Sequence, residues 1–321
     1  MPPWVVVGPG DDAAVIEPER GALEVVTTDA QVEGIHFDRR FVPPDAIGHR
    51  ALAVNLSDLA AMGAQPRAAL LSLALPDETL VSALDAMLDG LLALAAVHRT
   101  VLIGGNITRT TGPLVLDVTA IGTVKRRRVL TRAGARPGDE VYVTGTLGDA
   151  AVGLRWLRDG RADVRLDMHP CEARYLRPEP RVRAGVVVGR NRAASSCMDL
   201  SDGLADAVRQ VAEASGVGIT IDAAAIPISE SSRAWHAHGS LDVLQTALTG
   251  GDDYELLFTV RPTQRGRFRA ARKLFGGVPV TKIGAVTKDR ALIVKCGAHV
   301  RPLPQGYEHF AGSPESGPDS Q

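Results

Sequence analysis

The sequence predicts an α/β protein with mixed (α+β) sheets and two domains. Its 321 residues suffice for two modest domains, and 45% hydrophobic with 23% charged residues is ordinary globular usage. Short apolar runs alternate with longer stretches of helical periodicity. Residues 125–140 are basic, contain Gly and Pro and show little apolar periodicity, which predicts a junction. We expect a domain over residues 1–130, a second over 131–311 and a disordered polar tail over 312–321.

In the first half, residues 43–62 predict a helix, because Pro44 suits a first helical turn and Gly63 follows its end. Apolar residues recur there at helical spacing: Leu52, Leu56, Leu59 and Ala60. Asp77 is the expected cap of a long helix over residues 77–99. The expected strands of this half are 69–75, 101–105 and 113–124.

In the second half, residues 141–157 predict a strand that turns into a helix, and residues 196–216 predict another such unit. Gly216 is placed to end the second helix. The later expected strands are 254–260, 280–286 and 291–295.

Composition and charge exclude several classes of protein. The net charge is −1 with a sequence pI near 6.7, so the chain lacks the overall basic field of a nucleic-acid or membrane-surface protein. The three cysteines are far apart, which argues against a disulfide framework or a zinc knuckle and fits a cytoplasmic protein. No leader is evident, and no apolar stretch is expected to approach the length of a membrane span. None of the five lysines lies in a P-loop motif.

The start of the chain has the spacing of a dinucleotide-binding fingerprint. Gly8, Gly10 and Ala13 follow an apolar run, and Asp29 lies downstream. Only nine residues separate Ala13 from Leu23, and they contain a Pro and a Gly, so there is no room for a crossover helix. We therefore reject this interpretation and expect an antiparallel hairpin between residues 12–16 and 24–29.

That hairpin would bring Asp12 and Asp29 toward a common region. Further acids lie beside Gly, Ser or Thr at the ends of expected elements: Asp58, Asp199, Asp202, Asp252 and Asp253. The structural alternative stays open for each of them, because Ser201 or Asp202 could simply cap the following helix. Asp58 differs, since it lies near the apolar stripe of the 43–62 helix, where an unpartnered carboxylate is costly to bury.

Convergence of these acids would require a cation. Two like charges about 4 Å apart repel by ~4 kcal/mol at an effective dielectric constant of 20. An oxygen-only ligand set without His or Cys favours Mg²⁺ or Mn²⁺, and Mg²⁺ usually shares protein carboxylates with substrate phosphates. The acids therefore predict a nucleotide-dependent activity if they gather at one site.

Nine motifs in order resemble the thiamine-monophosphate kinase family over about residues 8–310: GDDAAV, TTDAQVEGIHF, NLSDLAAMGAQP, IGGNITR, LTRAGARPGD, VTGTLGDAAVGL, MDLSDGL, GGDDYELLF and GYEHF. Several are shared with a superfamily of ATP-dependent enzymes that lack a P-loop, including aminoimidazole ribonucleotide synthetase. The resemblance implies an N-terminal α/β domain that dimerises through its sheet, a C-terminal α/β domain and an active site in the cleft between them. It implies ATP and several Mg²⁺ ions, a homodimer, and no nucleic-acid or membrane partner.

The resemblance also implies roles for individual residues. The implied metal ligands are Asp12, Thr27, Thr28, Asp29, Asp58, Asn106, Asp199 and Asp202. The implied ATP contacts are Gly105, Asn106, Arg132 and Ser201, and the implied contacts to thiamine monophosphate are His36, Asp252 and Tyr307. Asp29, Asp58 and Arg132 are the implied catalytic groups. His98 lies near the family's adenine position, and a structural role as a charge at a helix end stays equally open.

Three departures from the family pattern affect these expectations. Asp252 stands where Glu is commoner and is one methylene shorter, and Asn106 stands where many relatives have Asp. Family members usually carry a helical segment before the Gly-Asp-Asp motif, which here begins at Gly10. If that segment helps to cover the nucleotide, we expect weaker ATP binding.

The implied reaction is transfer of the ATP γ-phosphoryl group to a phosphate oxygen of thiamine monophosphate, giving thiamine diphosphate and ADP. That oxygen is already ionised, so the lack of an obvious Ser-His or Cys-His pair is no objection. The alternatives are an aminoimidazole ribonucleotide synthetase-like enzyme and a non-catalytic nucleotide sensor that kept the acids.

Overall fold

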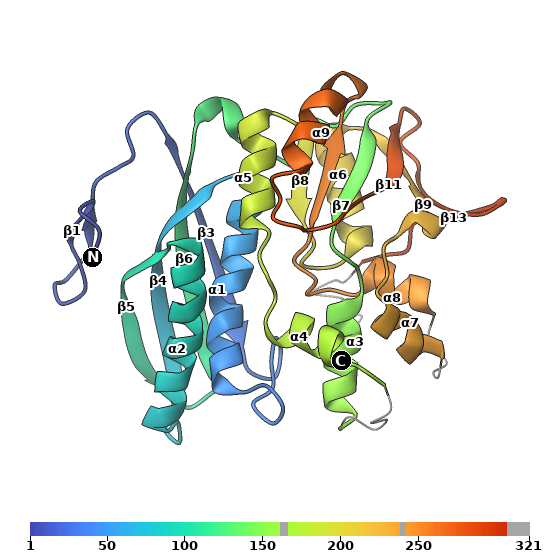
Figure 1. The fold of residues 1–321 in the computed structure, drawn as a ribbon. Helices are drawn as coiled ribbons and strands as arrows, with labels where there is room; N and C mark the ends of the chain where they lie inside the picture. Colours follow the sequence, from blue (N-terminus) through green and yellow to red (C-terminus); the bar gives the residue numbers. More distant parts are fainter. Residues whose placement is uncertain (161–165, 238–241, 307–321) are drawn as a thin grey trace, which may run out of the picture.

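The computed structural model describes residues 1–160, 166–237 and 242–306, and it confirms a mixed α/β architecture with two main sheets (Figure 1). The predicted tail at 312–321 lies outside the described residues. The four-stranded sheet comes from the first 124 residues and the seven-stranded sheet from the remainder. Helices α1 and α5 lie between the two sheets, and buried residues from both halves form one shared core. The boundary at residue 130 stays a prediction.

The four-stranded sheet has the order β3-β6-β4-β5, with antiparallel pairs except for parallel β4·β5. Its strands are β3 (Leu23–Val32), β4 (Gln65–Pro76), β5 (Val101–Thr110) and β6 (Val115–Val124). Helices α1 (Pro44–Ala61) and α2 (Val81–His98) cover one face. Alternate residues of β6 point into this covered core, among them Leu116, Val118 and Ala120. The sheet therefore has a covered face and an open face.

The expected hairpin at the start of the chain is wrong. Strand β1 (Val5–Val7) pairs with β2 (Val15–Ile16), and this small sheet stands apart at the edge of the molecule in Figure 1. Strand β3 pairs with β6 along its whole length instead. The turn between β1 and β2 uses the positive φ of Gly10, 116°, which a side chain would strain. Asp12 therefore lies on the turn of this separate hairpin.

The seven-stranded sheet has the order β13-β12-β9-β11-β7-β10-β8 and is antiparallel except for β12·β9. Its strands are β7 (Glu140–Thr144), β8 (Ser196–Asp199), β9 (Gly218–Asp222), β10 (Leu256–Val260), β11 (Val280–Thr287), β12 (Leu292–Cys296) and β13 (His299–Pro302). The helices of this half are α3 (Asp149–Arg158), α4 (His169–Leu176), α5 (Val182–Asn191), α6 (Leu204–Ser215), α7 (Glu230–Ala237), α8 (Val243–Thr249) and α9 (Arg265–Arg272). Strand β8, at one end of the sheet, contacts α1 and so adjoins the N-terminal half.

Most predicted elements are confirmed, with shifted ends. Helix α1 has Pro44 in its first turn, and Gly63 follows its end with φ 68°. Helix α2 begins four residues after Asp77, and its N-cap Leu80 makes no side-chain capping bond, so the predicted cap is wrong. Gly216 ends α6 in the left-handed conformation, as predicted.

Helix α2 corrects the expectation about apolar length. Its 18 residues have a mean hydropathy of 1.5, so by length and composition it could cross a membrane. One such helix is weak evidence, since core helices satisfy the same criterion. Here α2 packs against α1 and β5, with Met87, Leu91 and Leu94 buried.

Two glycines allow α1 and α2 to touch at their backbones. A Cβ on Gly48 would lie 1.7 Å from the Met87 carbonyl oxygen, and one on Gly90 would lie 1.9 Å from that of Asp45. We expect Gly48→Ala to force the helices apart and lower the free energy of unfolding by about 1–3 kcal/mol, as overpacking does. Urea unfolding measures this. Gly266→Ala in α9 meets open space and is the control, and equal stability of the two variants would contradict the close packing.

Candidate active site

A cleft of about 520 Å³ lies between the two halves. Strand β3 and helix α1 supply residues from the N-terminal side, and the segments after β8 and before β10 supply residues from the C-terminal side. Eight of the residues implied by the family resemblance line this cleft: Asp29, His36, Asp58, Arg132, Asp199, Ser201, Asp202 and Asp252. Their positions are separated by up to 223 residues in sequence, so the fold itself assembles this group.

Hydroxyl groups from two elements orient the central carboxylates. Thr27 on β3 donates a hydrogen bond to Asp58 Oδ2 on α1. Ser57, one residue earlier on α1, donates to Asp199 Oδ2 at the end of β8, with an Oγ–Oδ2 distance of 2.6 Å. Consecutive residues of one helix therefore connect to both sheets. The close approach of these elements places acids from three parts of the chain together.

The carboxylates repel one another in this arrangement. Burial and then the neighbouring Asp58 raise the pKa of Asp29 to about 7. Burial and then Asp58 likewise raise the pKa of Asp199 to about 7, while burial raises that of Asp58 against the opposing effects of Thr27 and Arg132. Such shifts mean that a bound cation would stabilise the charged forms. Positive charge bound at this site would therefore reduce the repulsion among the carboxylates.

The donor set fits magnesium. Carboxylate and hydroxyl oxygens line this part of the cleft, and Mg²⁺ prefers oxygen ligands. Among residues 1–160, 166–237 and 242–306, no group of three or more His, Cys, Asp or Glu side chains is already arranged as a metal site. A Mg²⁺ ion here would therefore draw further ligands from the substrate phosphates or from water.

The capping alternative for Ser201 and Asp202 is wrong. Helix α6 begins after Gly203, which occupies the N-cap position with φ 95° and has no side chain that could cap the helix. Ser201 and Asp202 precede this glycine and line the cleft instead. A Cβ at Gly203 would lie 2.8 Å from the Gly250 carbonyl oxygen, so the glycine also lets the two cleft segments approach.

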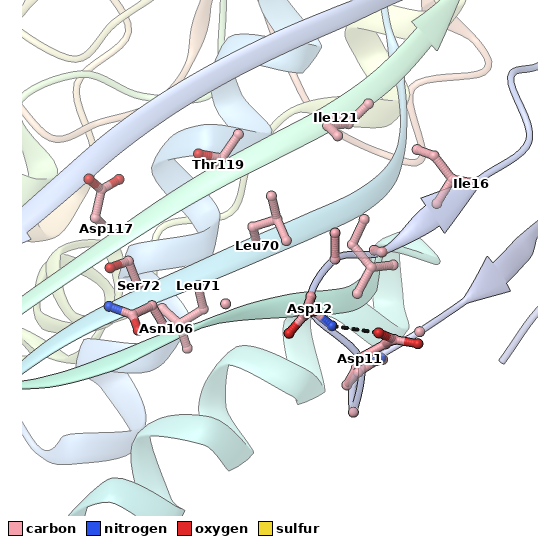
Figure 2. Close-up of a pocket in the computed structure, with 18 residues that line it drawn as sticks. Asp11, Asp12, Ile16, Leu70, Leu71, Ser72, Asn106, Asp117, Thr119 and Ile121 are labelled. Atoms are coloured by element: carbon pink, nitrogen blue, oxygen red, sulfur yellow. Dashed lines mark hydrogen bonds between the residues drawn. The ribbon is translucent and has the colours of Figure 1, made fainter.

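A second pocket of about 690 Å³ lies on the open face of the four-stranded sheet (Figure 2). It contains Asp12, Gly105 and Asn106 from the implied site residues. Thr28 faces this side as well, because it donates to Asp117 Oδ1 across 2.9 Å and Asp117 lines the pocket. Successive strand residues point to opposite faces, so the neighbouring Asp29 faces the cleft. In the single chain, the implied metal ligands are thus divided between two faces of one sheet.

Asp117 was not anticipated as part of any site. Asp117 on β6 pairs with Ser72 on β4, and Ser72 pairs with Asn106 on β5. In Figure 2 these three side chains form a polar row across the strands, and the Asp12 turn lies farther along the sheet. The sequence does contain a pattern that could have identified Asp117. This residue lies between apolar Leu116 and Val118, and the alternation indicates that its side chain is on the open face of a strand.

The remaining implied residues are placed as follows. His36 lines the cleft, and its Nδ1 accepts a hydrogen bond from the Val32 backbone N–H across 3.0 Å. Arg132 lines the cleft and donates to Gln210 Oε1. Tyr307 lies outside the described residues. His98 lines neither pocket, and burial lowers its pKa.

Comparisons with known proteins agree with this arrangement. The family models for the AIR synthase related protein N-terminal and C-terminal domains match residues 10–124 and 136–297. Thiamine-monophosphate kinase of Salmonella typhimurium is 41% identical over 311 residues, covering 96% of this chain and 93% of the relative. The Bacillus subtilis protein of the same name is 37% identical over 318 residues, covering 95% and 94%.

Solved structures give the same relationship. Thiamine-monophosphate kinase from Stenotrophomonas maltophilia superposes with a TM-score of 0.82 at 41% identity, covering 91% of each chain. AaThiL complexed with AMPPCP and TMP superposes with a TM-score of 0.80 at 31% identity, covering 92% of this chain and 89% of that one. With both domain models matched and relatives aligned over nearly their full length, the chain belongs to the thiamine-monophosphate kinase family.

Proposed function

We propose that this enzyme transfers the γ-phosphoryl group of ATP directly to thiamine monophosphate, in line and with the help of several Mg²⁺ ions. The observation that carries the proposal is the cleft itself, where four aspartates, an arginine and two implied substrate residues from both halves of the chain meet. Family membership supports the substrates, as does the structural similarity to AaThiL complexed with AMPPCP and TMP.

Charge is the main obstacle to this reaction, because two polyanions must approach. Asp29, Asp58, Asp199 and Asp202 would hold Mg²⁺, which neutralises phosphate charge and fixes the phosphates in place when bound. The guanidinium of Arg132 adds fixed positive charge at the same wall of the cleft. The acceptor phosphate is already ionised, so the protein needs no strong base. Catalysis then consists of positioning and charge neutralisation.

We assign substrate selection to His36 and Asp252, which both line the cleft. Thiamine monophosphate carries a positively charged thiazolium ring, and the Asp252 carboxylate offers the complementary negative charge. Ser201 also lines the cleft, and its hydroxyl would contact the nucleotide.

The open-face pocket is assigned to the nucleotide side of the same reaction. A Cβ on Gly105 would lie 1.9 Å from the Leu71 carbonyl oxygen, so β5 and β4 approach closely beside Asn106. Asp12 and Asn106 would supply oxygen donors there. We propose that this face also forms a homodimer interface, because Val26 on it is 61% exposed and apolar Leu70 and Ile121 line its pocket. The cytoplasmic location stays a prediction.

A direct product assay tests the activity. The purified chain is incubated with Mg-ATP and thiamine monophosphate, and thiamine diphosphate and ADP are quantified by chromatography. We expect the two products in equal amounts, and none without Mg²⁺. ADP without thiamine diphosphate would contradict thiamine monophosphate as the phosphoryl acceptor. No product here, but ADP formed once an aminoimidazole ribonucleotide synthetase substrate is added, would favour that alternative. Binding of both ligands without ADP release would contradict an enzyme and favour a sensor.

A further inference from the structure

Arg50 is a buried charge that the proposed chemistry does not use. It lies on α1, 1% exposed, with its guanidinium 4.4 Å from the centroid of the Tyr175 ring. Its Nη1 donates to the Tyr175 carbonyl oxygen, but its Nε and Nη2 have no hydrogen-bond partner. A buried guanidinium is costly unless an opposite charge compensates it. The position of that opposite charge therefore indicates what Arg50 does.

The nearest compensating charge is Asp252, across the boundary between the two halves. Arg50 Nη2 lies 3.4 Å from Asp252 Oδ1, which is an ion pair without hydrogen-bond alignment. The Tyr254 hydroxyl donates to the same Oδ1 across 3.0 Å. Within the described part of the chain, Oδ2 makes no hydrogen bond or ion pair. Since Asp252 is one-third exposed and lines the cleft, Oδ2 is the oxygen available to a ligand.

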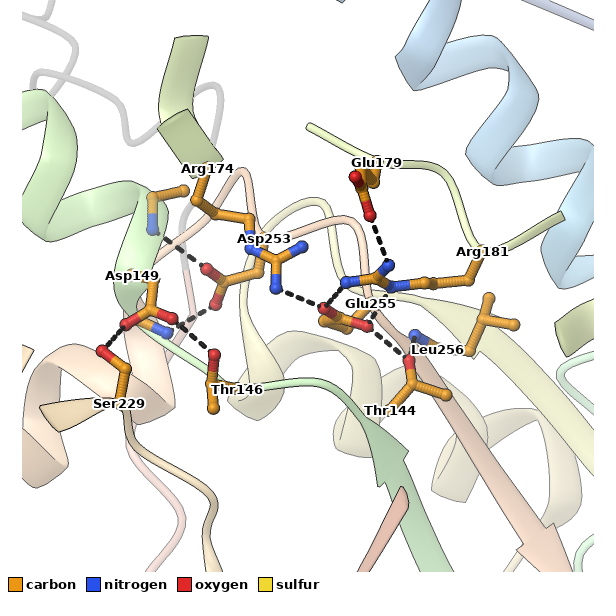
Figure 3. Close-up of polar contacts among 12 residues, drawn as sticks. Thr144, Thr146, Asp149, Arg174, Glu179, Arg181, Ser229, Asp253, Glu255 and Leu256 are labelled. Carbon is orange, nitrogen blue, oxygen red and sulfur yellow. Dashed lines mark hydrogen bonds and ion pairs between the residues drawn. The ribbon is translucent and has the colours of Figure 1, made fainter. Parts of the chain in front are cut away.

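The segment that carries Asp252 is held rigidly on its other side. Asp252 and Tyr254 both have left-handed backbones, with φ of 68° and 48°, which few residues other than glycine adopt without strain. The intervening Asp253 accepts hydrogen bonds from the backbone N–H groups of Gly148 and Ala150 across 2.6 and 3.1 Å (Figure 3). This anchoring fixes the chain directly after Asp252, so the rotation of its carboxylate depends on Tyr254 and Arg50.

We propose that Arg50 is a positioning residue that holds the Asp252 carboxylate with Oδ2 directed into the cleft toward the cationic part of the substrate. The inference rests on the proposed function, because it takes the substrate to be the thiazolium-bearing phosphate. Arg50 itself lies beneath the cleft wall and does not line it. Substrate recognition by the C-terminal half is thereby linked to a helix of the N-terminal half.

Steady-state kinetics of Arg50→Met test this assignment. Methionine keeps most of the volume and removes the charge. The Asp252 carboxylate left behind is one-third exposed and so remains partly solvated, which spares the fold the full cost of an unpaired buried ion. We expect the KM for thiamine monophosphate to rise about 10-fold, with the KM for ATP unchanged and kcat changed much less. Arg50→Lys, which keeps the charge but loses the planar fork, should recover part of the affinity. Arg301→Met on β13, another arginine with unpaired nitrogens, is the matched control and should leave every parameter unchanged.

A double-mutant cycle separates positioning from a general structural effect. In the Asp252→Asn background, adding Arg50→Met should change the thiamine monophosphate Kd by less than about 2-fold, because the group that it positions is already lost. An unchanged KM for thiamine monophosphate in folded Arg50→Met, or a full second loss in the double variant, would overturn the inference. If Arg50→Met fails to fold, Arg50→Gln replaces it, and an unchanged KM for thiamine monophosphate in that uncharged variant has the same meaning. A wild-type chain that makes no thiamine diphosphate would instead refute the proposed function.

Discussion

Asp29→Asn is expected to abolish formation of thiamine diphosphate while leaving the fold intact. Asp29 lies in the cleft beside Asp58, and burial together with that neighbour raises its pKa to about 7. Asparagine keeps the shape but removes the negative charge that would hold Mg²⁺. Loss of a residue on which charge neutralisation depends should lower kcat/KM by about 1,000-fold or more, as loss of a preorganised electrostatic group does.

The same substitution separates a metal role from a structural one. Removing one of two repelling carboxylates relieves repulsion in the metal-free protein, so Tm should be equal to or higher than that of the wild type. Asp85→Asn, on the exposed side of α2, is the control and should change neither activity nor Tm. Activity within a few-fold of the wild type in Asp29→Asn would contradict the metal assignment.

Periodicity made much of the N-terminal fold predictable. Helix α1 was recognised because apolar residues recur every three to four positions after Pro44, and the buried strands were recognised as short apolar runs. The pairing of β2 was not predictable in this way. Local turn chemistry indicated a hairpin, but the choice between β1 and β3 as its partner depends on long-range packing.

The site was predictable as a set of residues but not as a geometry. Family motifs placed both Thr28 and Asp29 among the ligands of several Mg²⁺ ions without saying which ion each one contacts. Strand alternation points these neighbours to opposite faces of the sheet. The sequence did not predict a role for Arg50, because an arginine in a helix is normally exposed to solvent. Only the packing of Tyr175 and Asp252 around it reveals a buried charge.

Glu255→Gln is expected to destabilise the protein more than any surface substitution. Glu255 is fully buried, and its carboxylate receives Arg181 through two hydrogen bonds of 2.6 and 2.7 Å (Figure 3). Arg174 Nη2 lies 2.8 Å from Oε1, and the Thr144 hydroxyl donates to Oε2 across 2.6 Å. The amide of glutamine would present a donor to one guanidinium, deprive the largely buried Arg174 of this counter-charge and leave Arg181 with only the exposed Glu179.

Breaking a buried pair in this way costs about 3–5 kcal/mol, because the uncompensated ion remains in a region of low dielectric constant. For a chain of this size that corresponds to a fall in Tm of roughly 10 °C. Glu179→Gln is the matched control. Glu179 pairs with the same Arg181 at 3.0 Å but is 76% exposed, so its loss should cost less than about 1 kcal/mol. Thermal unfolding of the two variants tests this prediction. Equal Tm values would mean that the Glu255 cluster contributes no more to stability than a surface ion pair does.

The Glu255 cluster also bears on function, because Glu255 follows Tyr254 directly and the strained turn of Asp252 depends on its anchor points. If Glu255→Gln loosens that turn, the KM for thiamine monophosphate should rise together with the fall in Tm, while Arg50→Met raises the same KM with little change in Tm. The two variants thus distinguish a rigid support for the substrate loop from the orientation of a single carboxylate. A rise in KM confined to Arg50→Met would show that Asp253 and its bonds to the start of α3 suffice to hold the loop.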